Sequence, residues 1–155
     1  MKKYIIIRIA AVAGLMSARL HAGDANQMHY VYLGTSQNTN ATTTGTAVDI
    51  SAYKGNGTFV FSRGDSTVTN QEVTVTIQHS AVLNFATYAT VTNISGTAGV
   101  MTFGTGTSVS SGSGVLTFPC DTGRLRKYVR AVYAQSVPDE SAPVSVLFVA
   151  PFKSQ

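Results

Sequence analysis

Tryptophan is absent from this chain of 155 residues, which also has only one cysteine and four prolines. The single cysteine, Cys120, excludes an internal disulfide framework and offers no cysteine-based zinc pattern. The stability of the fold must therefore come from packing. Charged residues are scarce as well, at 12% of the chain, which is about half of the usual share.

The positive charge is modest and unevenly placed. The formal net charge is +4 and the pI is near 9.4, and much of the excess comes from the N-terminus and from residues 124–130. Aromatic residues are not interleaved with the other basic residues, as they are on surfaces that bind nucleic acid. We therefore expect no direct binding of nucleic acid.

The first 25 residues admit two interpretations, a secretory signal and a structural arm. Arg8 interrupts the apolar run, and Leu20 stands where a signal needs a small residue before a cut after Ala22. The charge-free run 9–18 is also shorter than the roughly 20 residues that cross a bilayer. We expect an arm over residues 1–25 that contacts another chain, and no membrane anchor. Its candidate contact residues are Ile5, Ile6, Ile7 and Ile9.

After the arm, short strand-like runs rich in Thr and Val alternate with turn-forming clusters. The clearest is QEVTVTIQHS, residues 71–80, in which apolar and polar side chains alternate and predict one buried face. A polar loop is expected at residues 35–46 and a Gly/Ser-rich connection at 104–114. The other expected strands are 28–34, 58–62, 88–94, 99–103, 114–119, 127–135 and 144–151, and AVDI at 47–50 leads into the second of these.

About eight strands without a helix after residue 25 predict an all-β fold, namely a two-sheet antiparallel β-sandwich of jelly-roll type. The length suits a single sandwich domain over residues 26–155. Within it, Arg130 should project from the opposite face to Val129, because neighbouring residues of a strand alternate. The nearly continuous apolar run VSVLFVA is typical of a strand covered on both faces, with Val146 and Phe148 in the core.

Residues suited to catalysis are few. The histidines, His21, His29 and His79, are expected to be ordinary packed or surface residues, and the carboxylates form neither a calcium cage nor an acid–base pair. Cys120 has basic neighbours that could lower its pKa but no evident partner histidine, so we expect a structural role. The triplet DTG at 121–123 is interpreted as a turn. We predict no enzyme activity, no metal and no cofactor.

The C-terminal part of the chain carries a more specific pattern. A strand closes in DTGRLRKYVRAVY, a Pro-containing loop follows, and VSVLFVAPFK ends the chain. This order resembles small virion structural proteins of tailed bacteriophages and prophages, and VTVTIQHS is similar to their central strand. The resemblance covers roughly residues 47–153 and excludes the arm. Members often continue the central strand into an acidic Ser-Asp-Asp turn, where this chain has HSAVLNF.

The resemblance implies a capsid decoration or accessory head protein that binds the major capsid protein or other virion proteins, as a homo-oligomer on the phage head. The candidate contact residues outside the arm are Arg124, Arg126, Lys127 and Arg130. For Arg130 a second interpretation is that its stem covers the sheet while its head group bonds nearby carbonyls or Asp121. The alternative functions are a phage tail or tail-tip component and a secreted carbohydrate-binding sandwich.

Overall fold

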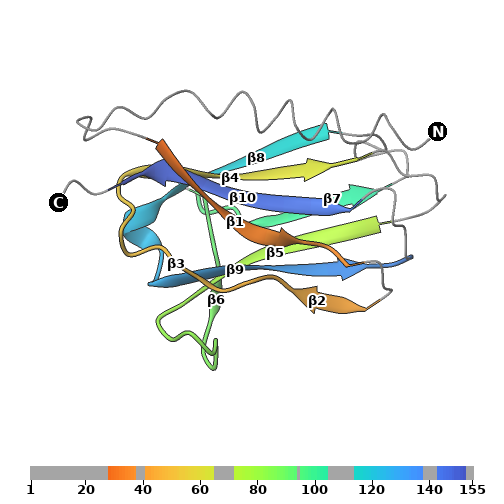
Figure 1. Ribbon diagram of the computed structural model, residues 1–155, viewed down its shortest axis with the longest axis horizontal. Helices are drawn as coiled ribbons and strands as arrows, with labels where there is room; N and C mark the ends of the chain where they lie inside the picture. Colours follow the sequence, from red (N-terminus) through yellow and green to blue (C-terminus); the bar gives the residue numbers. More distant parts are fainter. Residues whose placement is uncertain are drawn as a thin grey trace.

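The computed structural model describes residues 28–37, 41–64, 72–93, 95–104, 114–137 and 143–152. These residues form ten strands, arranged in two sheets that face each other (Figure 1). The arm, with its candidate contact residues Ile5, Ile6, Ile7 and Ile9, lies outside the described residues.

The first sheet, called the β1 sheet here, has four antiparallel strands in the order β1-β10-β4-β8. An irregularity between Tyr32 and Gly34 interrupts the pairing of β1 with β10. The bounds are β1 (Met28–Thr35), β10 (Val144–Pro151), β4 (Asn56–Arg63) and β8 (Gly114–Asp121).

The second sheet, called the β9 sheet here, is built around two long paired strands, β9 (Tyr128–Gln135) and β5 (Glu72–Ser80). Two short strands pair with the free edge of β9, and two others pair with the free edge of β5. These are β2 (Thr42–Thr44) and β3 (Val48–Asp49) beside β9, and β6 (Ala89–Thr90) and β7 (Val100–Gly104) beside β5.

The connections identify the architecture. Counting β2 with β3 and β6 with β7 as one position each gives eight positions, four in each sheet. Every connection between successive positions crosses from one sheet to the other, except the one from β5 to β6. An eight-position, two-sheet arrangement of this kind is a jelly roll. The predicted fold class is therefore confirmed.

The core lies between the sheets, where side chains at alternate positions of the long strands β4, β5, β9 and β10 are buried. Val146 and Phe148 are fully buried, as predicted, and so is Val129, while Arg130 lies on the opposite face of β9. The Phe148 ring lies 4.8 Å from the ring of Phe59, measured between centroids, and this contact joins β10 to β4 inside the core.

Two expectations from the sequence are wrong or only partly met. The predicted loop 35–46 contains β2, a strand of three threonines whose place is set by pairing with β9. The run VSVLFVA was expected to be covered on both faces, but the outward residues Leu147 and Val149 are only half-buried among the described residues.

Candidate functional site

The basic residues after Cys120 lie in a short turn at one end of the sandwich. Asp121 begins this turn, because its carboxylate accepts a hydrogen bond from the backbone N–H of Gly123 at 2.8 Å. A single 3-10 turn, Thr122–Arg124, follows, and Arg124 is its last residue. The triplet DTG thus acts as a capped turn, as the sequence predicts.

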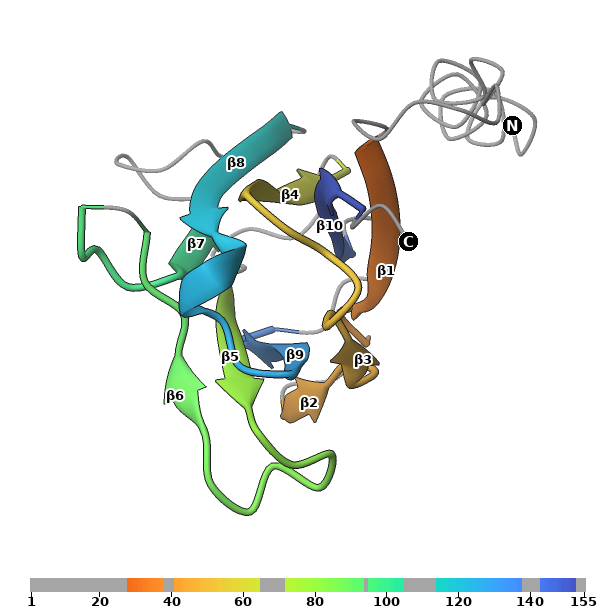
Figure 2. The ribbon, with the colours of Figure 1, turned by 90° about the vertical axis from the view of Figure 1, so that its left-hand side faces the viewer.

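Hydrogen bonds tie this turn to the strand connections beside it. The Thr122 backbone N–H and its hydroxyl both donate to the carbonyl of Gly55, at 2.9 and 2.8 Å. The next residue back, Lys54, donates its backbone N–H to Pro151 at the end of β10. We call this part of the molecule, residues 50–55 and 121–127, the basic end. Figure 2 looks onto it and shows the turn between β8 and β9.

Both ends of the described chain lie beside the basic end. Met28, the first described residue, pairs with Pro151, and Phe152 forms a bridge with Tyr53. The N-terminal arm therefore leaves the sandwich at the same end that carries the basic turn. The fold brings together two features that are about a hundred residues apart in the sequence.

Three of the predicted contact residues, Arg124, Arg126 and Lys127, are exposed at the basic end, and Lys54 adds a fourth cation that the sequence analysis missed. Lys127 forms an ion pair with Asp49, at 3.5 Å between Nζ and Oδ2. Hydrogen bonds from Ser51 and then the Lys127 ammonium lower the pKa of Asp49, so this carboxylate stays charged near neutral pH. An exposed pair of this kind stabilises the fold little.

A hollow of about 320 Å³ lies at the centre of the basic end. Its wall combines apolar side chains, Ile50, Tyr53 and Leu125, with the cations Arg126 and Lys127. The adjoining His79 accepts a hydrogen bond at Nδ1 from the backbone N–H of Arg126, at 3.2 Å. Burial and the nearby Arg126 charge lower the pKa of His79, so the imidazole is neutral at pH 7. The surface can attract carboxylates and also bury some apolar area.

Arg130 does not join this group. Its Nε donates to Oε1 of Gln78 at 2.9 Å, and its guanidinium lies 4.1 Å from the centre of the Phe85 ring and 5.6 Å from that of Tyr88. Of the two kinds of partner expected for its head group, a nearby carbonyl and Asp121, the structure shows the amide carbonyl oxygen of Gln78, while the Asp121 carboxylate caps the turn. A packed arginine is the better interpretation of this residue.

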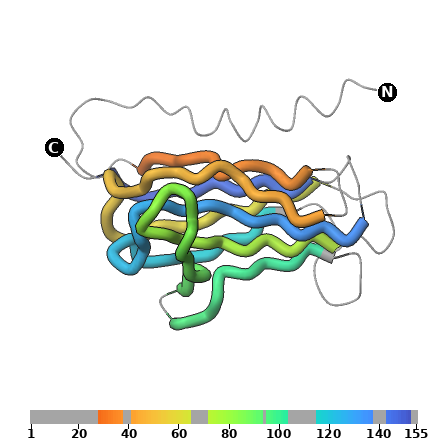
Figure 3. The backbone as a smooth tube through the Cα atoms, turned by 90° about the horizontal axis from the view of Figure 1, so that it is seen from below, coloured from red at the N-terminus to blue at the C-terminus, as the bar shows by residue number. Residues whose placement is uncertain are grey.

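The rings around Arg130 come from loop 81–88, which folds back over the outer surface of the β9 sheet (Figure 3). Phe85 adopts a positive φ of 53° and is buried, and Ser80 holds the loop base by donating its hydroxyl to the carbonyl of Thr87. Such a backbone conformation is uncommon outside glycine. No periodic pattern in HSAVLNF could have predicted this loop.

The environment of Cys120 supports the structural role predicted for it. Its side chain is fully buried between the sheets. Burial, together with the neighbouring Asp121 carboxylate, raises the pKa of the thiol from 9.0 to about 12. The basic residues of the turn therefore do not activate it, and the thiol is protonated at neutral pH.

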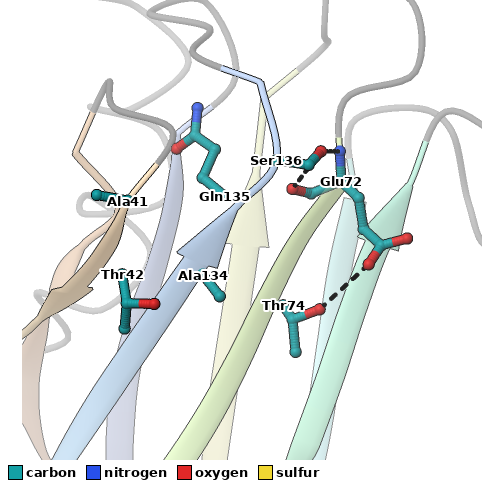
Figure 4. Close-up of a pocket in the computed structure, with 7 residues that line it drawn as sticks. All are labelled: Ala41, Thr42, Glu72, Thr74, Ala134, Gln135 and Ser136. Atoms are coloured by element: carbon teal, nitrogen blue, oxygen red, sulfur yellow. Dashed lines mark hydrogen bonds between the residues drawn. The ribbon is translucent and has the colours of Figure 1, made fainter.

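A second hollow, of about 280 Å³, lies at the opposite end of the sandwich (Figure 4). Among the described residues of its wall, Glu72 alone is ionisable; it accepts a bond of 3.5 Å from the Thr74 hydroxyl, and its backbone N–H donates to Ser136. Its wall consists of Ala41, Thr42, Glu72, Thr74, Ala134, Gln135 and Ser136. A general acid–base pair would need a second titratable group here.

Two kinds of feature are absent from the described residues, a cluster of metal ligands and a helix that could span a membrane. In those ranges, His, Cys, Asp and Glu do not gather in threes that could hold a metal ion. The same ranges contain no helix with the length and apolar character needed to cross a bilayer.

Comparison with known proteins gives weak structural neighbours only. Neither a scan against protein-family models nor a search of curated proteins found a match. The chain is similar to a solved structure of infectious bursal disease virus Gx strain, with 13% identity and a TM-score of 0.33. It is also similar to that of the Gt strain, with 15% identity and a TM-score of 0.32.

These alignments cover most of this chain, 84% and 86%, but only 38% and 43% of the two viral chains. The chain thus spans less than half the length of the solved chains that it matches. The strand connections, rather than this likeness, establish the jelly roll.

Proposed function

We propose that this chain is a non-enzymatic structural protein of a virion, and more specifically an accessory protein that binds the shell of a phage head. The observation that carries the proposal is the clustering at the basic end. Two of the three exposed cations, Arg126 and Lys127, line a partly apolar hollow there, next to the point where the arm joins β1.

The basic end combines two features suited to binding another protein, namely exposed cations and an apolar hollow. Exposed cations attract carboxylates during encounter, while an apolar centre supplies contact that salt does not screen. The acids at this end are mostly engaged, because Asp49 pairs with Lys127 and Asp121 caps the turn. Arg124 and Arg126 are the cations best placed to meet a carboxylate on a shell protein.

The fold and the sequence pattern add independent support. A jelly roll is a common architecture of capsid proteins, and residues 47–153 resemble virion proteins in the order of their strands. The low content of charge and the high content of Thr and Val suit a protein whose purpose is stable attachment.

Quantitative mass spectrometry of purified particles tests the proposal. The lysate must contain the chain at its native level, and the particles are separated by density before their proteins are counted. Hundreds of copies per particle are expected of a head accessory protein. A few copies would instead assign the chain to the tail, and absence from particles would reject a virion role.

A further inference from the structure

The outward surface of the β1 sheet carries no charged side chain over most of its area. Every second residue of these four strands points outward. Among these described outward residues only Asp121, at the end of β8, is charged. The apolar members gather over β1 and β10, whereas the outward residues of β4 and β8 are mostly polar, as at Thr58, Ser62 and Thr117. The apolar group consists of Met28, Tyr30, Tyr32, Leu147, Val149, Pro151 and the adjoining Val60 of β4.

Several of the outward apolar side chains are open to solvent in the isolated molecule. Met28, Tyr30, Tyr32 and Val115 expose 53%, 59%, 52% and 60% of their surface. They lie on the two edge strands, β1 and β8, while Leu147 on the central strand β10 is half-buried. A contiguous exposed apolar patch such as the one over β1 and β10 often marks an interaction site in a soluble protein.

The outer face of the β9 sheet, unlike that of the β1 sheet, carries charged and covered residues. The outward residues of the β9 sheet include Thr74, Thr76 and Arg130, and loop 81–88 covers part of that surface. Antiparallel sheets commonly keep one polar, solvated face, and the β9 sheet follows that rule. The β1 sheet differs because its outer face is apolar over β1 and β10, and this part of the face would be stabilised by a cover.

We infer that the outer face of the β1 sheet binds residues 5–18 of the N-terminal arm of a neighbouring copy. The inference rests on the proposed function, because it names the contact that holds the homo-oligomer together. The segment has matching chemistry: it is almost wholly apolar, with Arg8 as its one charge. A long arginine stem can lie on apolar surface while its head group reaches the rim.

The length of residues 5–18 fits the size of the outer face of the β1 sheet. Eight-residue strands make a face about 26 Å long, and four strands make it about 19 Å wide. Residues 5–18 would extend about 21 Å as a helix. The nine residues between the segment and β1 can reach about 30 Å when extended. The arm is thus long enough to cross to a second molecule and cover the middle of its face.

The entry point of the arm favours a neighbour over the same molecule. Met28 lies at the end of the sheet, paired with Pro151, so the line of β1, extended backwards, points off that end. Covering its own face would require the chain to turn back within the nine residues 19–27. A neighbouring copy beyond the basic end can receive the arm without such a reversal.

Photo-crosslinking between labelled and unlabelled copies tests the inference directly. The full-length chain carries a benzophenone amino acid in place of Tyr30, and isotope-labelled and unlabelled copies are mixed before irradiation. We expect crosslinked peptides that join position 30 of one copy to residues 5–18 of the other. Crosslinks confined to a single copy, or joining two β1 sheets directly, would overturn the inference.

Light scattering on point variants gives a second readout. Tyr30→Lys should weaken self-association about tenfold or more, because the ammonium must lose its water against apolar surface. The matched control Thr44→Lys places the same charge on an exposed residue of β2 and should leave the mass unchanged. Deleting residues 1–23 should give a monomer that still unfolds cooperatively, because the sandwich has its own core.

Several results would reject the arm contact. They are a monomeric full-length chain, an oligomer that survives the deletion, and a native protein whose mass begins at residue 23 or 26. Particle binding is scored separately. An oligomer held by the arm that never binds particles would reject the virion role and leave this inference standing.

Discussion

Phe148 shows how much one residue contributes to this fold. Its ring is fully buried and contacts the rings of Phe59 and Tyr53, at 4.8 and 5.5 Å between centroids. Gly57 leaves the space that the ring fills, because a Cβ at this position would lie 2.8 Å from Phe148. The glycine and the phenylalanine are therefore complementary in shape.

Phe148→Ala should lower the free energy of unfolding by about 3–5 kcal/mol, since the core cannot collapse fully around the lost ring. Urea denaturation measures the change. The matched control is Val132→Ala, a truncation on the outward face of β9, which should cost clearly less. Equal costs would show that β10 does not close the core in the way described.

Cys120 should make stability depend on alkaline pH. The pKa of the buried thiol is about 12, against 9.0 when it is exposed, so the unfolded chain loses this proton first as pH rises. The resulting stability is fully present below about pH 9 and is lost between that pH and about 12. Burial raises the pKa of Tyr133 as well, which adds a loss in the same direction.

Cys120→Ala should therefore reduce, without abolishing, the fall in the urea midpoint between about pH 8 and about pH 10.5. The variant should assemble and bind as the unchanged chain does. Parallel pH profiles of the two proteins would contradict the role of the thiol. Loss of binding by a folded variant would contradict its structural assignment.

At the scale of elements, loop 81–88 depends on Arg130. The guanidinium joins β9 to the loop by stacking on Phe85, and its bond to Gln78 joins β9 to β5. A charge-assisted hydrogen bond contributes about 1.5–3 kcal/mol, and a cation–π contact about 0.5–1 kcal/mol at an exposed site.

Arg130→Ala should accelerate hydrogen exchange across residues 81–88 and lower stability by about 1–3 kcal/mol. Arg130→Lys should restore little, because an ammonium cannot reproduce the planar stacking. Arg126→Ala removes an exposed arginine at the basic end and is the matched control. If both alanine variants change exchange in the loop equally, Arg130 is not what holds it.

At the scale of the whole molecule, the basic end should act mainly on the rate of encounter with a shell. Screening lengths fall from about 10 Å at 0.1 M salt to about 3 Å at 1 M, so exposed charge pairs weaken while apolar contacts persist. Binding to particles stripped of this protein should therefore survive high salt with reduced affinity. Complete loss of affinity at 1 M salt would assign attachment to charge alone.

Replacing Arg124 and Arg126 together by glutamine should slow association more than it speeds release, because charges at a rim act mainly on encounter. Surface plasmon resonance on immobilised particles separates the two rates. The control Thr44→Glu plus Thr92→Glu lowers the net charge by the same amount away from the basic end. An equal effect of both pairs would indicate total charge rather than this surface.

The sequence alone determined the fold class and most strands. Alternation in residues 72–80 placed Val73, Val75 and Ile77 in the core, and turn residues at 121–123 ended a strand. Both signals are local, since period two follows from backbone geometry and a capped turn needs only its own side chains. The basic composition of residues 124–127 likewise pointed to the candidate site at the basic end.

Only the tertiary structure decided the rest, because those features arise from long-range pairing. The threonines 42–44 have no apolar alternation and become β2 through hydrogen bonding to β9. Arg130 meets Phe85 only because loop 81–88 folds back, and Met28 joins the basic end only through β10. The uncharged outer face of the β1 sheet combines four strands that are distant in sequence. No local pattern encodes such a neighbourhood, since it exists only after the jelly roll has closed.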